Sequence, residues 1–592
     1  MMRPDNPLIV QSDRSLMLHT VTSVVDAQGR PVKDAQGRPT TREHPRFAEA
    51  RDQIALFAEL EKSPDYLHTY RITPISVWNA AAMGLTAEKI EATLEEFACV
   101  PVPRNVVTEI RGWIERYGLL RLEKREGEGA SARYELVAAR GDALAEVLGH
   151  KSVRELVELD RTNRAFVGGE NRGAIKQALI RLGFPVDDRG GYIQGDAFAI
   201  PLRTTTRGGR PFALRAYQEG AARAFHAGGT VLGGSGVVVL PCGAGKTVVG
   251  MAVMSLVGTK TLVLTTNTVA VRQWREELLD KTGLRPEDVA EYTGDEKHVA
   301  PVTITTYQML TWRRSRTEEF EHFTLFGREN WGLVVYDEVH LLPAPVFRVT
   351  ADLQARRRLG LTATLVREDH KEDEVFCLIG PKRYDVPWKV LESQGFIATA
   401  RCVEVRVPLD GALRTLYAAA DARAKFRIAS ENPAKFGVID KLVLLHKGSH
   451  ILVIGQYIEQ LHALQRHLQA PLITGKTPTA EREKLYAGFK SGAVPLLIVS
   501  KVGNFAIDLP DANVAIQISG TFGSRQEEAQ RLGRILRPKS DGGPAVFYSI
   551  VTLGSRDQDF AQRRQLFLTE QGYTYEIVEA QSLANAPTTP TR

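Results

Sequence analysis

The sequence predicts an α/β protein whose larger part is two tandem domains, each built on a parallel sheet. Short β-branched runs alternate with helical segments through this part of the chain. The first series of runs begins at 237, 262, 302, 333 and 359, and the second begins at 451, 496, 514 and 545. Alternation of this kind builds βαβ units around parallel sheets, and two series indicate two sheets.

The part that precedes these series predicts a mainly helical N-terminal region, followed by a small α+β domain. Apolar residues recur at helical spacing between 107 and 117, just after Pro103. The strand-like segments LLRLEK and RYELVAA come next, with a Gly-rich turn between them. Three helices and a hairpin are the pattern of a winged-helix module. Such modules bind DNA or dock proteins, and the sequence favours neither use.

These patterns predict five parts of the chain, because 592 residues are too many for one core. We expect a winged-helix-like domain, a small domain, two parallel-sheet domains and a disordered tail, over 1–150, 151–205, 206–390, 391–582 and 583–592. Within the first part, a partial repeat at 26–39 with Gly-Arg-Pro ends predicts an exposed hairpin or loop.

Composition excludes several classes of protein. No run approaches eighteen consecutive apolar residues, and the N-terminus lacks a secretory pattern. The four cysteines form no CxxC pair, which argues against a disulfide framework or a zinc site and indicates a reducing cytoplasm. The 76 basic and 70 acidic residues leave a net charge of +6, which permits nucleic-acid binding without demonstrating it.

A phosphate-binding loop is the strongest local signal. In VVVLPCGAGKTVVGMAV, residues 237–253, a buried strand runs into a loop of small residues and then a helix. Glycines let backbone N–H groups approach phosphate oxygens, and the helix N-terminus adds its dipole. Lysine reaches the β- and γ-phosphates, and threonine joins the Mg²⁺ shell. The strict pattern has glycine where this chain has Leu240. The expected nucleotide contacts are Gly243, Ala244, Gly245, Lys246 and Thr247.

About ninety residues later, WGLVVYDEVH supplies the second half of the site. Its apolar strand ends in Asp337 and Glu338, beside the expected ligand crevice of a parallel sheet. We expect Asp337, with Thr247, to position Mg²⁺, and Glu338 to polarise the attacking water. Together with Lys246, this pair predicts an ATPase.

Several segments resemble, in order, the serial motifs of superfamily 2 helicases. LRAYQEGA implies an adenine contact by Gln218, whose amide matches an adenine edge. TTNTVAVRQW and TITTYQML imply DNA-backbone contacts, and LTAT implies coupling of hydrolysis to domain movement. SKVGNFAIDLP and EEAQRLGRILRPK resemble the motifs of the second domain. The residues implied are Thr266, Thr306 and Lys501 on DNA, Thr362, Thr364 and His340 in coupling, and Gln530, Arg534 and Arg537 in catalysis.

Closer matches indicate one family. DEVH, LTATLVRED, IGPKRYDVPW, AQRLGRILR and RRQLFLTEQGY resemble the XPB family of DNA translocases, over most of the chain. The resemblance is weaker over 8–20, 45–140 and 155–205, the last of which is similar to the family's damage-recognition domain. It implies a compact prokaryotic form with two RecA-like domains, ATP between them and 3′→5′ movement. Arg367, Glu368 and Asp369 match the family's strand-separating motif.

Residues 405–436 lie where the family carries a thumb-like insertion. The basic character of this stretch supports an insertion that holds DNA. A solvated helical connector is an equally good interpretation. The basic residues in question are Arg423, Lys425, Arg427 and Lys435.

The expected activity is ATP-dependent DNA opening or remodelling in repair, with low sequence preference because phosphate contacts carry no base information. Three alternatives remain open: a duplex translocase without free unwinding, an RNA helicase, and an ATP-switched recruiter of a partner nuclease. The chain has no convincing nuclease cluster of its own, since His340, Asp352 and His370 are scattered. Pathway, lesion, partner and oligomeric state do not follow from the sequence.

Overall fold

The chain forms two compact units in the computed structural model: Met1–Val239 with Lys246–Asp385, and Leu240–Gly245 with Val386–Arg592. The described residues are 3, 5–24, 26, 30, 32–33, 40–62, 66–82, 84–127, 132–190, 194–229, 233–294, 296–312, 322, 329–342, 357–363, 375, 378–500, 512–520, 532–533, 545–570, 573 and 575–584. No helix among them is long and apolar enough to cross a bilayer.

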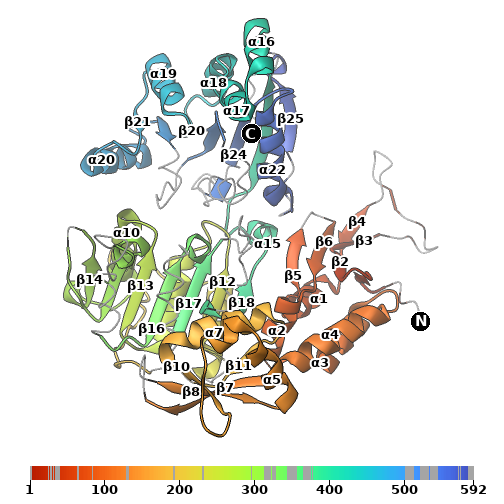
Figure 1. Ribbon diagram of the computed structural model, residues 1–592. Helices are drawn as coiled ribbons and strands as arrows, with labels where there is room; N and C mark the ends of the chain where they lie inside the picture. The colour runs from red at the N-terminus through yellow and green to blue at the C-terminus, as the bar shows by residue number, and fades with distance from the viewer. Residues whose placement is uncertain are drawn as a thin grey trace. The chain divides into compact units, whose positions relative to one another are not determined.

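The first unit begins with a four-stranded antiparallel sheet covered by helices (Figure 1). The strand order is β1-β2-β6-β5, that is Leu8–Val10, Ser15–His19, Leu67–Arg71 and Glu59–Lys62. The helices are α1 Phe47–Ile54, α2 Pro74–Ala82, α3 Ala87–Phe97 and α4 Arg104–Arg116. Leu16, Leu18, Leu94 and Ile110 are among the residues of its closed core. The expected helices are present, but the sheet on which they pack was not expected.

A two-stranded ribbon, β3 Val21–Ser23 and β4 Thr41–Glu43, flanks the repeat at 26–39. The ribbon is antiparallel, so the chain does reverse direction here, as a hairpin or loop requires. Most of the repeat itself lies outside the described residues.

A second, five-stranded sheet has the order β11-β7-β8-β10-β9. Its strands are Val186–Asp188, Leu120–Glu126, Arg133–Ala138, Ala165–Gly168 and Glu158–Leu159. The helices α5 Gly141–Gly149, α6 Lys151–Arg154, η2 Gly169–Asn171 and α7 Arg172–Arg181 accompany it. The expected hairpin is β7–β8, but it continues into this sheet instead of forming a wing. A domain boundary at 150 therefore cuts through a single sheet.

The parallel sheet of the first unit has seven strands, in the order β14-β15-β13-β16-β17-β12-β18 (Figure 1). The strands are Val289–Tyr292, Val302–Thr306, Thr261–Thr265, Leu333–Asp337, Arg357–Thr362, Ser235–Val239 and Lys382–Asp385. All five runs predicted for the first series are strands here. They were recognisable because a parallel strand covered on both faces is apolar throughout, as the wholly buried β12, β13 and β15 are.

Helices connect these strands. They are α8 Ala216–His226, α9 Lys246–Val257, α10 Thr268–Lys281 and α11 Tyr307–Leu310, with short turns η3 Ala227–Gly229, η4 Pro286–Asp288 and η5 Val339–Leu341. Because every strand pairing is parallel, all carboxyl ends meet at one edge of the sheet. The phosphate loop, Asp337 and Thr362 all follow or end strands at that edge.

The second unit contains another seven-stranded parallel sheet, in the order β21-β22-β20-β23-β24-β19-β25. The strands are Leu472–Ile473, Leu496–Ser500, Ile451–Gly455, Val514–Gln517, Ala545–Thr552, Ala400–Val407 and Tyr575–Glu579. The four runs predicted for the second series are β20, β22, β23 and β24. The prediction of two tandem parallel sheets is confirmed.

The helices of the second unit are α15 Trp388–Ser393, α16 Gly411–Ala419, α17 Ala422–Ser430, α18 Ala434–Leu445, α19 Ile458–Leu468, α20 Thr479–Lys490, α22 Arg556–Glu570 and η8 Ser582–Ala584. Leu583 packs against the core of this sheet, so the folded part extends slightly past the expected limit at 582. Residues 585–592 of the predicted tail lie outside the described residues.

Candidate functional site

The loop 240–245 joins β12 to α9 and has the backbone geometry of a phosphate cradle. Gly243 and Gly245 have φ of 81° and 77°, in the left-handed region that side chains with a Cβ disfavour. α9 begins at Lys246, and Thr247 is its second residue. Successive backbone N–H groups in such a loop, together with the helix N-terminus, form an anion site.

Lys246 and Glu338 meet at the carboxyl edge of the sheet. The Lys246 Nζ lies 3.4 Å from the Glu338 Oε1, and the two side chains are 11% and 24% exposed. A cation and a carboxylate that come from segments about ninety residues apart are therefore adjacent, as the sequence predicted.

Asp337 is held in place from two sides. The Trp274 indole Nε1 donates a hydrogen bond of 2.9 Å to its Oδ2, and the Glu338 backbone N–H donates one of 3.0 Å to its Oδ1. The Tyr307 hydroxyl donates to the Asp337 carbonyl oxygen at 2.8 Å. Trp274 is the last residue of the motif TTNTVAVRQW, but the motif did not predict its contact with Asp337. The available signal was a tryptophan N–H, which needs a polar partner when buried.

The electrostatics of this pair fit a divalent metal ion. The pKa of Asp337 is raised to about 6, mainly by burial and next by the neighbouring Glu338 charge, while Trp274 and Lys246 oppose the shift. Two carboxylates this close repel each other, and a cation between them would remove that cost. The donor set of Asp337 and the Thr247 hydroxyl suits Mg²⁺, which prefers oxygen ligands and keeps several waters.

Glu338 adopts an unusual backbone conformation. Its φ of 49° and ψ of 52° place it in the left-handed region, where a glutamate is uncommon. The chain turns there from β16 into η5. Strain of this kind is tolerated where it aims a side chain, and here the aimed carboxylate faces Lys246.

His340 and Thr362 form a buried pair. The His340 Nδ1 lies 2.7 Å from the Thr362 Oγ1, and the two residues are 4% and 0% exposed. The same Nδ1 lies 3.5 Å from the Glu338 Oε2. Two of the three predicted coupling residues are thus in contact with each other and next to the predicted base.

Gln218 is buried in the first turn of α8. Its side-chain oxygen accepts a hydrogen bond of 3.0 Å from the Arg215 backbone N–H and so caps the helix. A carbonyl oxygen has a second lone pair, and the amide nitrogen has two hydrogens.

The two threonines predicted to contact DNA lie at the carboxyl edge of the sheet, where Thr266 follows β13 and Thr306 ends β15. Thr306 is 7% exposed, and its hydroxyl accepts a hydrogen bond of 3.1 Å from the Met309 N–H, which caps α11. The Thr266 hydroxyl accepts one of 3.2 Å from the Asn267 side chain. Thr266 is partly exposed, as a phosphate contact requires. The Thr306 hydroxyl is instead used to cap α11 in this structure.

The remaining predicted site residues lie outside the described residues, and their roles rest on the sequence alone. They are Thr364, Arg367, Glu368, Asp369, Lys501, Gln530, Arg534 and Arg537.

The basic residues of 405–436 differ in their placement: Arg423 is exposed, whereas Lys435 is buried. Lys435 is fully buried, and its Nζ contacts the Asp557 Oδ2 at 2.7 Å and the Ile518 carbonyl oxygen at 3.0 Å. Arg427 pairs with Glu431 and Glu459 at the surface. Lys435 therefore adds nothing to a basic surface on this stretch, because its charge neutralises the buried Asp557 carboxylate. Helices α16 and α17 fill this stretch.

Two curated relatives match nearly the whole chain. The DNA 3′-5′ helicase XPB of Kineococcus radiotolerans is 50% identical over 580 residues, which cover 98% of this chain and 97% of that protein. The protein of the same name from Mycobacterium tuberculosis is 48% identical over 581 residues, which cover 98% and 99%. The chain belongs to the XPB family. It is therefore an ATP-dependent helicase of superfamily 2.

More distant XPB relatives include a subunit of the yeast general transcription and DNA repair factor IIH. This XPB/SSL2 protein of Saccharomyces cerevisiae is 31% identical over 604 residues, which cover 90% of this chain and 70% of that protein. A solved structure of S. cerevisiae Dbp5 bound to RNA and ADP BeF3 is 15% identical, with a TM-score of 0.47 over 62% of this chain and 91% of that one.

Three family models match successive parts of the chain. The ERCC3/RAD25/XPB C-terminal helicase family matches residues 391–589, and the res subunit family of type III restriction enzymes matches 211–367. A family described as helicase conserved C-terminal domain matches residues 39–162. The first two matches fall on the two parallel-sheet regions of this XPB family member.

Proposed function

We propose that this chain is a cytoplasmic, ATP-driven 3′→5′ DNA helicase or translocase that opens or remodels DNA during repair. The observation that carries the proposal is the adjacency of Lys246 and Glu338, 3.4 Å apart, beside an Asp337 fixed by Trp274. The names of the close relatives support DNA as the substrate and the direction of movement.

Each residue of the site has a chemical task in this proposal. The loop N–H groups and Lys246 bind the β- and γ-phosphates, and Gln218 contacts the adenine. Glu338 orients the attacking water and accepts its proton. Asp337 and Thr247 would hold Mg²⁺, which when bound neutralises charge on the phosphate oxygens. His340 and Thr362 connect the base to β17, so that a change at the γ-phosphate is transmitted to the sheet.

ATP hydrolysis by the full-length chain tests the proposal. We would compare no nucleic acid, single-stranded DNA, duplex DNA, forked DNA and RNA, with Lys246→Ala as the control. The expected result is stimulation by DNA that the control variant lacks. Hydrolysis stimulated by RNA alone would overturn the assignment of substrate, while the ATPase assignment would stand.

Strand displacement tests direction and unwinding. Duplexes with a 3′ or a 5′ single-stranded tail are offered with ATP, and we expect displacement only from the 3′ tail. DNA-stimulated hydrolysis with displacement from neither tail would favour duplex translocation, or action through a partner nuclease. Displacement from the 5′ tail alone would contradict the proposed direction.

A further inference from the structure

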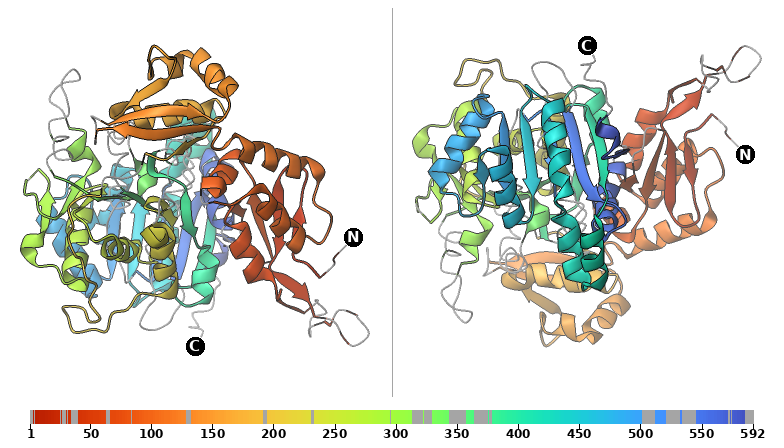
Figure 2. Two further views of the ribbon diagram at one scale, coloured as in Figure 1. Left: turned by 90° about the horizontal axis from the view of Figure 1, so that it is seen from below. Right: turned by 90° about the horizontal axis from the view of Figure 1, so that it is seen from above.

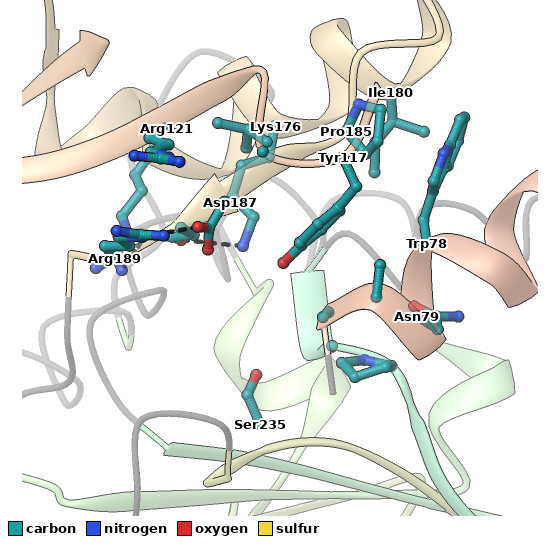
Figure 3. Close-up of a pocket in the computed structure, with 18 of the residues that line it drawn as sticks. Trp78, Asn79, Tyr117, Arg121, Lys176, Ile180, Pro185, Asp187, Arg189 and Ser235 are labelled. Carbon is teal, nitrogen blue, oxygen red and sulfur yellow. Dashed lines mark hydrogen bonds and ion pairs between the residues drawn. The ribbon is translucent and has the colours of Figure 1, made fainter. Parts of the chain in front are cut away.

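A cavity of about 740 Å³ lies within the first unit, and no residue of the phosphate loop lines it. It is bordered by α2, by the five-stranded sheet with α7, and by the parallel sheet near Ser235 and Arg358 (Figure 3). Ser235 is the first residue of β12, and Arg358 is the second residue of β17. The cavity therefore meets the amino ends of the strands whose carboxyl ends carry the ATP site. Figure 2 shows the five-stranded sheet beside the parallel sheet from two further directions.

The lining is strongly basic. Two carboxylates, Asp187 and Asp188, line the cavity together with six cations: Arg121, Arg172, Lys176, Arg189, Arg358 and Arg383. Asp188 contacts Arg172 at 2.6 Å and Lys176 at 3.1 Å, and Asp187 contacts Arg189 at 2.7 Å. The described lining therefore has four more cationic than anionic side chains, a composition that suits an anionic ligand.

Several of these cations are fixed by the fold. Arg358 is 3% exposed and donates a hydrogen bond of 3.0 Å to the Ser235 hydroxyl. The Arg383 Nε donates to the Ser235 carbonyl oxygen at 2.8 Å. Arg172, also 3% exposed, donates to the Tyr134 hydroxyl at 3.0 Å. Guanidinium groups held in this way bind a phosphate with little loss of side-chain entropy.

Arg121 has unused donor capacity. Its Nε is buried, and no acceptor among the described residues lies within hydrogen-bond distance of it. A buried donor without a partner is costly, and a ligand oxygen in the cavity would satisfy it. Burial lowers the pKa of Lys176, Asp188 raises it, and Arg358 and Arg172 lower it further. The neighbouring guanidinium groups therefore disfavour the charged form of Lys176, and Asp188 favours it.

The opposite side of the cavity is aromatic. Figure 3 shows Trp78 and Tyr117 across from Arg121 and Arg189, with Asn79 next to Trp78. The Trp78 indole N–H donates a hydrogen bond of 3.0 Å to the Trp113 carbonyl oxygen, and this bond fixes the ring. Aromatic rings stack on nucleobases irrespective of sequence, and an amide can hydrogen-bond a base edge.

We propose that this cavity binds a free nucleoside phosphate, with its phosphate on Arg121 and the neighbouring cations and its base against Trp78 and Tyr117. The volume lies within the range of about 300–1,000 Å³ typical of small-molecule sites. The proposal is independent of the activity proposed above, because no residue of the ATP site takes part.

Equilibrium dialysis of labelled GMP against the full-length chain tests the site. A monophosphate lacks the β- and γ-phosphates that the loop lysine binds, and the Lys246→Ala variant further separates the two sites. We expect one GMP per chain in both the wild type and Lys246→Ala. Arg121→Ala should weaken binding about tenfold or more, since a hydrogen bond to a charged group is lost. Trp78→Leu should weaken it as well.

Lys124→Ala is the matched control, because Lys124 is an exposed cation of the same strand that does not line the cavity. It should bind GMP like the wild type, and thermal melting of each variant checks the fold. Absence of GMP binding, or binding that Arg121→Ala and Trp78→Leu leave unchanged, would overturn the proposal. Binding of a single-stranded oligonucleotide instead of GMP, abolished by Arg121→Ala, would also overturn it and identify a strand-binding site.

Discussion

The Trp274 indole nitrogen donates a 2.9 Å hydrogen bond to the Oδ2 of Asp337 and thereby joins helix α10 to the end of β16. The indole N–H binds one carboxylate oxygen of Asp337, and the Glu338 backbone N–H binds the other. The plane of the carboxylate is therefore fixed. Preorganisation of this kind lowers the cost of holding a metal-bound phosphate.

Trp274→Phe should therefore impair metal use more than nucleotide binding. We expect the Mg²⁺ concentration for half-maximal ATP hydrolysis to rise, and the maximal rate to fall about tenfold, the loss expected for one charge-assisted hydrogen bond. A Mg²⁺ titration of hydrolysis measures both. Trp312→Phe is the control, because this tryptophan is 42% exposed and donates no hydrogen bond to Asp337 in the described part of the chain. An unchanged titration curve would show that the indole contact does not position Asp337.

Glu338→Gln should abolish hydrolysis and spare ATP binding. The amide cannot accept the proton of the attacking water, and loss of a general base costs about 10²–10⁴ in rate. The measurements are steady-state hydrolysis and binding of labelled ATP. Lys246→Ala is the comparison, because it should weaken binding itself. Near-normal hydrolysis by Glu338→Gln would remove Glu338 from the role of base.

His340 and Thr362 should act as a unit. A double-mutant cycle with His340→Ala and Thr362→Val is expected to be non-additive by about 0.5–3 kcal/mol, because their contact is 2.7 Å and buried. The readout is the ratio of DNA-stimulated to basal ATP hydrolysis, which a merely structural role would not change. Additive effects on that ratio would contradict the coupling role.

Lys435→Met should reduce stability without affecting DNA affinity. Breaking a buried ion pair costs about 3–5 kcal/mol, and the loss of Lys435 leaves Asp557 with the more distant Arg564, 3.9 Å away. Denaturant unfolding measures the loss, and fluorescence anisotropy with duplex DNA measures affinity. Arg423→Ala, at an exposed position of α17, should be nearly neutral for stability. A fall in DNA affinity in folded Lys435→Met would restore the thumb-like role of this residue.

His68 should make the N-terminal sheet sensitive to acid. Burial lowers the pKa of this imidazole to about 4, and its ring packs edge-on against Phe47 at 5.1 Å. The unfolded chain, with a pKa near the ordinary 6.5, then binds more protons between those values. Stability is therefore complete above about pH 6.5 and falls as the pH drops towards 4, by up to about 3 kcal/mol. His68→Gln should flatten unfolding curves across that window, and an unchanged pH dependence would contradict the assignment.

What the sequence predicted well is what neighbouring residues determine. The strand runs at 237 and 333 were visible because parallel strands are apolar throughout, and Lys246 and Glu338 were found because each follows its own strand. What it missed depends on distant partners. Nothing near Lys435 indicates Asp557, 122 positions later.

The same reason explains the misplaced domain boundary. The hairpin β7–β8 is a local feature and was predicted, whereas the parallel pairing of β7 with β11 joins Leu120 to Val186. Local patterns carry no information about such pairings, because strand partners are chosen by burial across the whole domain. The cavity between the sheets was invisible to the sequence for this reason as well.

The two left-handed glycines of the loop 240–245 have a genetic consequence. Every single-base missense change in a glycine codon introduces a residue with a Cβ, and at φ of 81° or 77° each such residue is strained whatever its chemistry. In a saturation library selected for activity, Gly243 and Gly245 should therefore be depleted of almost all variants, conservative or not. The neighbouring Cys242 has no positive φ, so it should accept small replacements. The tolerated substitutions at each position of the gene would then report which loop residues have a left-handed backbone.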